Sequence, residues 1–240
     1  PLIQAPMAGV QNHRLAAAVC QAGGLGSLPA AMLSADALQA ELIALQGLTK
    51  RPYNVNFFCH AAPRPDAERE ARWREALAPH YKAWGLDASA IPNGPGRVPF
   101  ANETADVLEA FRPAVVSFHF GLPDADLLTR VKSWGSKIIS SATTVDEALW
   151  LESQGVDAVI AQGLEAGGHR GHFLNLVNMQ LDCDQDTLLI QANPNGPVCH
   201  TGTDTCWGEE NKKSSVDFLQ ELEAVIANRK NAAPESSYVA

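Results

Sequence analysis

Residues 114–161 read AVVSFHFGLPDADLLTRVKSWGSKIISSATTVDEALWLESQGVDAVIA, and this stretch decides the fold class. Short runs rich in Val, Ile and Ala have the length and composition of buried strands, and two longer segments between them have the apolar periodicity of helices. Strands that alternate with helices in this way become parallel neighbours, because a parallel pair needs a crossover connection. The stretch therefore predicts an α/β fold. Its strands are Ala114–Phe118, Lys137–Ser140 and Asp157–Ala161, and its helices are Pro123–Trp134 and Thr144–Gln154.

The same alternation extends toward the N-terminus. Gly and Pro in residues 85–101 indicate a loop, and Asn12 and Ser34 have the side chains that cap helix N-termini. Together with the first stretch, this makes about six strand–helix units. The further strands are Leu2–Ala5, Gly24–Leu28 and Tyr53–Phe58, and the further helices are residues 12–22, 35–47, 65–84 and 102–111.

Two architectures fit such units, an open doubly wound sheet and a TIM-type (β/α)₈ barrel. The first strand is not followed by a G-x-G-x-x-G turn, which disfavours a dinucleotide-binding sheet. Polar or Gly-rich residues follow nearly every strand, and in a barrel those strand ends converge on one face, where active sites form. We therefore expect an incomplete barrel. The strand ends are Met7–Gly9, Asn56, His119, Ser141–Thr144 and Gln162–His172.

Composition excludes several classes of protein. The chain has 240 residues, is 46% hydrophobic and has a formal net charge of −9. That apolar content predicts a folded core, and no apolar run is long enough to span a membrane. The acidic charge disfavours nucleic-acid binding, which needs clustered Lys and Arg. With five cysteines and no visible secretory segment, a disulfide framework is not expected, and we predict a cytoplasmic protein.

The character of the sequence changes near residue 175. Residues 175–240 carry 10 acidic and 4 basic side chains. Two alternating runs, Met179–Cys183 and Thr187–Ala192, predict a β-hairpin, and residues 214–230 predict an amphipathic helix. Alternate positions on a strand share one face, so the three carboxylates of the acidic trio would suit a hard cation such as Mg²⁺. The three thiols would suit either Zn²⁺ or plain burial. The two trios are Asp182, Asp184 and Asp186, and Cys183, Cys199 and Cys206.

Five separate strand-end motifs carry a resemblance over about 170 residues: IQAPMAGV (3–10), AGGLGSL (22–28), RPYNVNFFCH (51–60), VVSFHFGLP (115–123) and AQGLEAGGHRGHF (161–173). Their order and spacing resemble the nitronate monooxygenase family, flavin enzymes formerly called 2-nitropropane dioxygenases. The resemblance implies an FMN at the carboxyl face of a barrel. It also implies that alkyl nitronates are oxidised with O₂ to a carbonyl compound and nitrite.

The resemblance assigns residues as well. It implies His169 as the catalytic histidine and His119 as a pocket histidine near the substrate. A histidine that titrates near neutrality can take a proton from an acidic C–H group or hold an anionic nitronate. The implied flavin contacts are Ala5, Pro6, Met7, Gly9, Asn56, Gln162, Gly167 and Gly168.

The C-terminal quarter resembles other enzymes. The patterns D-C-D-x-D, G-P-x-C-H-T-G and T-C-W resemble the C-terminal part of phosphoribosyl-AMP cyclohydrolase, and residues 214–240 resemble the start of phosphoribosyl-ATP pyrophosphatase. This resemblance implies that the cysteine trio binds zinc in a site completed by two subunits, and that the aspartate trio binds magnesium. We accordingly interpret the chain as a chimera with segments 1–173, 174–213 and 214–240.

The flavin oxidoreductase is the function we expect first. Nothing after Phe173 resembles the loops with which this family holds the FMN phosphate, so weakened flavin binding is predicted. The alternatives are a zinc- and magnesium-dependent hydrolase fragment of histidine biosynthesis and a catalytically inactive chimera. We expect a small-molecule substrate in the first two cases, and a homodimer is one possible assembly.

Overall fold

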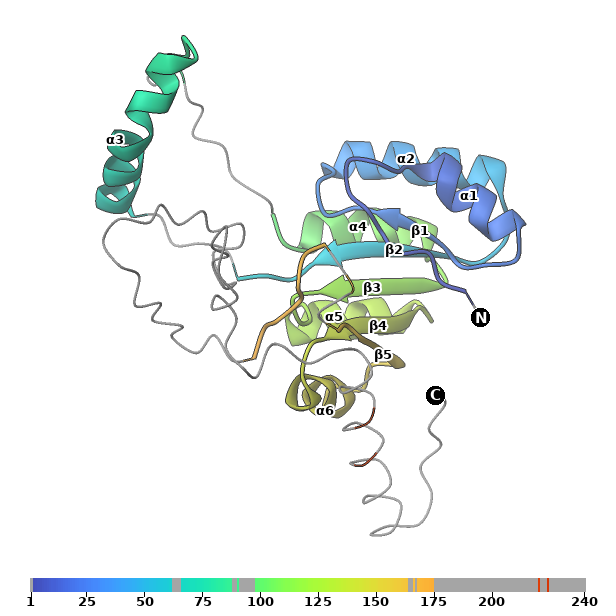
Figure 1. Ribbon diagram of the computed structural model, residues 1–240. Helices are drawn as coiled ribbons and strands as arrows, with labels where there is room; N and C mark the ends of the chain where they lie inside the picture. The colour runs from blue at the N-terminus through green and yellow to red at the C-terminus, as the bar shows by residue number, and fades with distance from the viewer. Residues whose placement is uncertain are drawn as a thin grey trace.

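The computed structural model describes residues 2–61, 66–87, 90, 98–163, 166, 168–174, 220 and 224, and every structural statement below concerns these residues. Five parallel strands form one sheet in the order β1-β2-β3-β4-β5 (Figure 1). Each strand therefore pairs with the strand that follows it in the chain. The strands are β1 (Gly26–Pro29), β2 (Tyr53–Phe58), β3 (Val115–His119), β4 (Lys137–Ala142) and β5 (Ala158–Ala161).

Helices connect these strands, and two of the six begin at the caps expected from the sequence, Asn12 and Ser34. The side chains of Asn12, Ser34 and Thr144 each accept a hydrogen bond from a backbone N–H in the first turn of the helix that follows. Pro123 was expected inside a first turn, but it precedes the N-cap residue Asp124. The helices are α1 (His13–Gln21), α2 (Ala35–Leu48), α3 (Ala67–Ala83), α4 (Asn102–Phe111), α5 (Ala125–Ser133) and α6 (Val145–Ser153).

The order of the strands distinguishes between the two architectures. In a doubly wound sheet the strand order reverses and successive helices cover opposite faces. Here the order does not reverse, and α1 packs on α2, α2 on α4, and α4 on α5, so these helices form one layer. The arrangement is that of consecutive barrel units, and closure into a barrel remains a prediction. The strand expected at Leu2–Ala5 is reduced to a single parallel bridge between Ile3 and Leu25.

The two faces of the sheet differ in polarity. Leu28, Val55, Val116 and Ile138 belong to the buried core, where α2 adds Leu38, Leu42 and Leu45. Because side chains alternate along a strand, their neighbours point to the other face. That face carries buried polar groups joined across strands: the Asn54 amide donates to the hydroxyls of Ser27 and Ser117, at 3.0 and 2.8 Å. One face of the sheet is therefore apolar, and the other carries a buried network of polar side chains.

Two regions add little to this core. No side chain of α3 is buried, and the helix lies away from the sheet in Figure 1. The hairpin predicted between Met179 and Ala192 lies outside the described residues, as does nearly all of the helix predicted over 214–230. The predicted boundaries at residues 173 and 213 stay predictions.

Candidate active site

The carboxyl ends of β2 to β5 bring the predicted site residues to one edge of the sheet. Asn56 lies near the end of β2, His119 ends β3, and Gln162 directly follows β5. The loop of residues 168–174 closes over this edge. The fold therefore gathers residues from separate motifs, as the strand-end pattern predicted.

His119 is the polar centre of this edge. Its Nε2 lies 2.9 Å from the carbonyl oxygen of His169, and its Nδ1 lies 2.5 Å from Oγ of Ser141. A carbonyl only accepts, so Nε2 carries the proton and Nδ1 accepts from the Ser141 hydroxyl. Burial lowers the pKa of His119 to about 4, although the hydrogen bond to the His169 carbonyl acts in the opposite direction. His119 is thus a neutral ring with both nitrogens engaged, which suits positioning better than proton abstraction.

This geometry predicts the pH behaviour of His119. A folded pKa of about 4 against an ordinary 6.5 means that the unfolded chain binds more protons between these values. The free energy of unfolding should therefore rise with pH across that window. We expect NMR to find His119 neutral from pH 5.5 to 8, and His119→Gln to lose part of the pH dependence of unfolding. An NMR titration midpoint near 6.5 would contradict this assignment.

His169 lies on the loop beside this ring. Its carbonyl accepts from both His119 and the Gln162 amide, the latter at 2.8 Å. Its exposed imidazole lies among aromatic rings, with ring centroids 5.8 Å from Phe58 and 6.3 Å from Phe120. The backbone at His169 is therefore held in place, while the side chain is presented beside apolar surface.

Gln162 holds the loop rather than pointing away from it. Its Nε2 donates to the His169 carbonyl, and its Oε1 accepts from the backbone N–H of Gly171, at 2.8 Å. Gly171 is in turn packed against His119: a Cβ there would lie 2.6 Å from Cε1 of His119 and 2.8 Å from Oγ of Ser141. Position 171 of the loop therefore has no room for a side chain beside the His119 ring.

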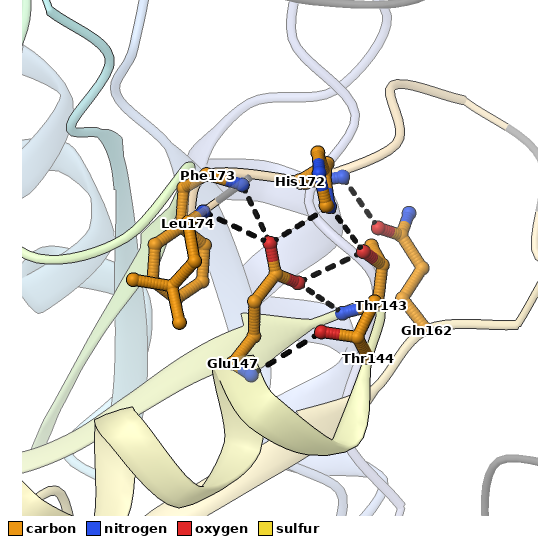
Figure 2. Close-up of polar contacts among 8 residues, drawn as sticks. Thr143, Thr144, Glu147, Gln162, His172, Phe173 and Leu174 are labelled. Atoms are coloured by element: carbon orange, nitrogen blue, oxygen red, sulfur yellow. Dashed lines mark hydrogen bonds and ion pairs between the residues drawn. The ribbon is translucent and has the colours of Figure 1, made fainter. Parts of the chain in front are cut away.

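A buried carboxylate fastens the far end of the loop, as Figure 2 shows. Glu147 lies in the first turn of α6 and is completely buried. One of its oxygens accepts from the N–H and hydroxyl of Thr143, and the other from the N–H groups of Phe173 and Leu174. The second oxygen also lies 2.9 Å from Nδ1 of His172. Burial by itself would raise the pKa of Glu147, but the hydrogen bonds from His172, Phe173 and Thr143 hold it below its ordinary value.

The turn after the first bridge carries the other predicted flavin contacts. Ala5, Met7 and Gly9 are exposed, and Met7 keeps 49% of its surface accessible. Gln11 braces this turn by donating to the carbonyls of Ala5 and Ser27. Gly9 has φ +83°, a conformation that favours glycine. An open cavity of about 500 Å³ lies beside the turn. Among the predicted site residues only Gly9 lines this cavity, and Asn56, His119 and Gln162 do not.

The residues present fit the ring part of a flavin only in part. An exposed apolar turn offers a wall for a planar ring, and amide groups stand at the neighbouring strand ends. The fit is partial, because Asn56 already donates its amide to Ser117, at 2.9 Å, and Gln162 is engaged with the loop. Gly168 lies in the same loop with φ +67°. Gly167 lies outside the described residues.

The metal predictions fall where the structure gives no description. Asp182, Cys183, Asp184, Asp186, Cys199 and Cys206 all lie outside the described residues. In the part of the chain that is described, no group of three or more His, Cys, Asp or Glu side chains could hold a metal ion. The described helices also include none that could cross a membrane.

The sequence alone missed the residues that hold the site together. Glu147, Gln11 and Gly171 were not proposed, although Gln11 and Gly171 contact predicted residues and Glu147 binds the backbone of the loop that carries His169. Thr144 and Glu147 have the T-x-x-E spacing of a capping box, which could have marked the start of α6. That spacing gives no sign that the carboxylate would bind a loop 26 residues further along.

Comparison with known proteins gives a consistent result. A family model for nitronate monooxygenase matches residues 1–193. A nitronate monooxygenase of Paraburkholderia phytofirmans is 46% identical over 178 residues, covering 72% of this chain and 48% of the relative. Another, from Pseudomonas aeruginosa, is 41% identical over 181 residues, covering 72% and 50%. The chain thus spans about half the length of the curated relatives it matches.

Solved structures agree with this match. A nitroalkane oxidase from Streptomyces ansochromogenes is 42% identical with a TM-score of 0.62, covering 71% of this chain and 48% of the other. A FabK mutant from Thermotoga maritima is 26% identical with a TM-score of 0.52, covering 74% and 47%.

The family match also bears on the C-terminal quarter. It ends at residue 193, past the boundary predicted at 173, and so includes Asp182, Cys183, Asp184 and Asp186. These findings lend no support to a cyclohydrolase segment or to zinc and magnesium ligands. Since the match covers most of the sequence, the chain belongs to the nitronate monooxygenase family.

Proposed function

We propose that the chain is an FMN-dependent oxidoreductase of the nitronate-oxidising type. The observation that carries the proposal is the His169 loop, held beside His119 at the carboxyl edge of the sheet in a member of this family. O₂ would be the second substrate, and a carbonyl compound and nitrite the products.

Each part of the edge has a role in this proposal. FMN, when bound, accepts the electrons that leave the nitronate. The turn from Ala5 to Gly9 supplies an apolar wall for its ring, and the glycines of the loop allow close approach of the backbone. The His169 imidazole takes the acidic proton of a nitroalkane or holds the anionic nitronate. His119 keeps the His169 backbone in place, as its two engaged nitrogens indicate.

Replacement of His169 tests the proposal. We expect purified protein supplied with FMN to release nitrite from a neutral nitroalkane, and His169→Asn to lower turnover about 100-fold or more, as for loss of a general base. His80→Asn is a matched control, since His80 lies on α3, which has no buried side chain. Nitrite release at the wild-type rate in His169→Asn would remove this residue from its role.

The strength of flavin binding is a separate point. Weak binding was predicted because the residues after Phe173 do not resemble the family's phosphate-binding loops. A visible spectrum of the purified chain, titrated with FMN, measures it directly, and a tight stoichiometric complex would contradict the prediction. The metal ligands at Cys183, Cys199, Cys206, Asp182, Asp184 and Asp186 remain a proposal that rests on sequence spacing and on the resemblance to phosphoribosyl-AMP cyclohydrolase.

A further inference from the structure

Glu147 is a carboxylate with 0% exposed surface, and it belongs to none of the residues predicted to bind flavin or substrate. Glutamate is almost never fully buried unless its charge is paired. A buried charge without partners would be strongly destabilising. The hydrogen-bond donors around the Glu147 carboxylate therefore show which segments it binds together.

Those groups come from two separate segments (Figure 2). In the segment just before α6, Thr143 donates to Oε2 of Glu147 from its N–H at 2.7 Å and from its hydroxyl at 2.8 Å. On the other side, Oε1 accepts from the Phe173 N–H at 2.6 Å and from the Leu174 N–H at 3.3 Å. The His172 ring adds a contact of 2.9 Å to the same oxygen. A carboxylate only accepts, and every one of these partners can donate.

The loop of residues 168–174 is therefore held at both ends, by His119 and Gln162 at one end and by Glu147 at the other. At residues 169 and 171, His119 and Gln162 hold the backbone. At residues 172–174, Glu147 holds it, and Phe173 packs on Trp150 of α6 with ring centroids 5.3 Å apart. If the loop moved away, the carboxylate of Glu147 would lose its partners from residues 172–174 and keep only those of Thr143. The carboxylate thus favours the one loop position that presents His169 beside Phe58 and Phe120.

We propose that Glu147 is a positioning residue for His169, which acts by binding the backbone of residues 173–174. Its effect on turnover rests on the proposed function, whereas its effect on the loop does not. The carboxylate holds the loop and takes no part in the chemistry.

Glu147→Gln tests this proposal with little change in shape. A carboxamide has an NH₂ group at one end, and this group must face the donors either of Thr143 or of Phe173 and Leu174. In either orientation the N–H groups of the loop lose their charged acceptor, because the carboxamide is neutral. Asp146→Asn is the matched control, because it removes the same charge from the same turn at an exposed position.

Two measurements need no flavin. We expect the Phe173 amide of Glu147→Gln to exchange at least about tenfold faster, the factor for loss of about one hydrogen bond. We also expect trypsin to cleave after Arg170 faster by a similar factor. Asp146→Asn should match the wild type in both. Wild-type exchange and cleavage in Glu147→Gln would overturn the proposal.

Kinetics separate positioning from plain stability. With FMN and a neutral nitroalkane, kcat of Glu147→Gln should fall about 100-fold while KM changes less than about threefold, as expected when a reacting group is misplaced by about 1 Å. A lower melting temperature with unchanged kcat for the folded fraction would mean a structural role only and would overturn the proposal. If the wild type itself does not release nitrite, the proposed function fails, and the exchange and protease results still decide the role of Glu147 in the loop.

A second variant covers the case in which Glu147→Gln does not fold. Thr143→Val removes the hydroxyl donor and its 3.1 Å contact with Nδ1 of His172, and it keeps the carboxylate and its bonds to the backbone of Phe173 and Leu174. We expect it to fold and to retain wild-type protection at Phe173. Loss of that protection in Thr143→Val, with Glu147 intact, would contradict the assignment of loop binding to the carboxylate.

Discussion

Gly26→Ala should destabilise the protein by about 3 kcal/mol, the upper range for overpacking a well-packed core. A Cβ at Gly26 would lie 2.0 Å from the carbonyl oxygen of Ala16 and 2.7 Å from Sγ of Cys20. The nearest atom is helix backbone, which cannot turn aside as a flexible side chain can. The added methyl would therefore push α1 away from β1 and open the buried core at Ala16 and Cys20.

Urea unfolding followed by circular dichroism measures this effect. Gly47→Ala is the matched control, because a Cβ there meets nothing within 4 Å and Gly47 lies inside α2. Alanine in a helix interior is favoured over glycine by about 0.5–1 kcal/mol, so the control should be slightly stabilised. An unfolding midpoint for Gly26→Ala equal to that of the wild type would show that α1 does not pack on β1 as described.

Gly171→Ala should release His119 from its place and abolish most activity of the site. The new Cβ would lie 2.6 Å from Cε1 of His119, so either the ring or the loop must move. In both cases the bonds of His119 to Ser141 and to the His169 carbonyl are lost, at a cost of about 2 kcal/mol. Since burial is what lowers the pKa of His119 to about 4, we expect the pKa to rise toward 6.5.

An NMR titration of the histidines and the nitrite assay check this outcome. The double variant Gly171→Ala with His119→Ala provides the internal test, because removing the ring makes room for the methyl group. We expect the double variant to be more stable than the sum of the two single changes, with an interaction energy of about 1–2 kcal/mol. Strict additivity would show that the methyl and the ring do not meet.

The local elements could be predicted because their determinants are local. The apolar run at Tyr53–Phe58 forms a strand with those bounds, and Asn12 and Ser34 cap their helices as expected. Each of these outcomes depends on periodicity, propensity or one side chain beside its own backbone. The gathering of Asn56, His119 and Gln162 at one edge could also be predicted, because parallel strands bring their carboxyl ends together.

The roles of those residues could not be predicted in the same way. His119 was expected to line a pocket. Which of its nitrogens is protonated depends on a carbonyl 50 residues away, and its low pKa depends on burial. Gln162 was expected to contact a flavin, and the tertiary structure engages its amide with the loop. A hydrogen bond between distant residues leaves no periodic signal in a sequence, because only the folded backbone sets the distance between the two groups.

The sequence by itself determined the alternation of strands and helices, the helix caps and the family motifs, all of which are encoded within short segments. Only the tertiary structure decided that Glu147 would hold the His169 loop and that Gly26 and Gly171 would admit no side chain. Those outcomes follow from the close packing of segments far apart in the chain, where a single methyl group or one unpaired carboxylate changes the balance.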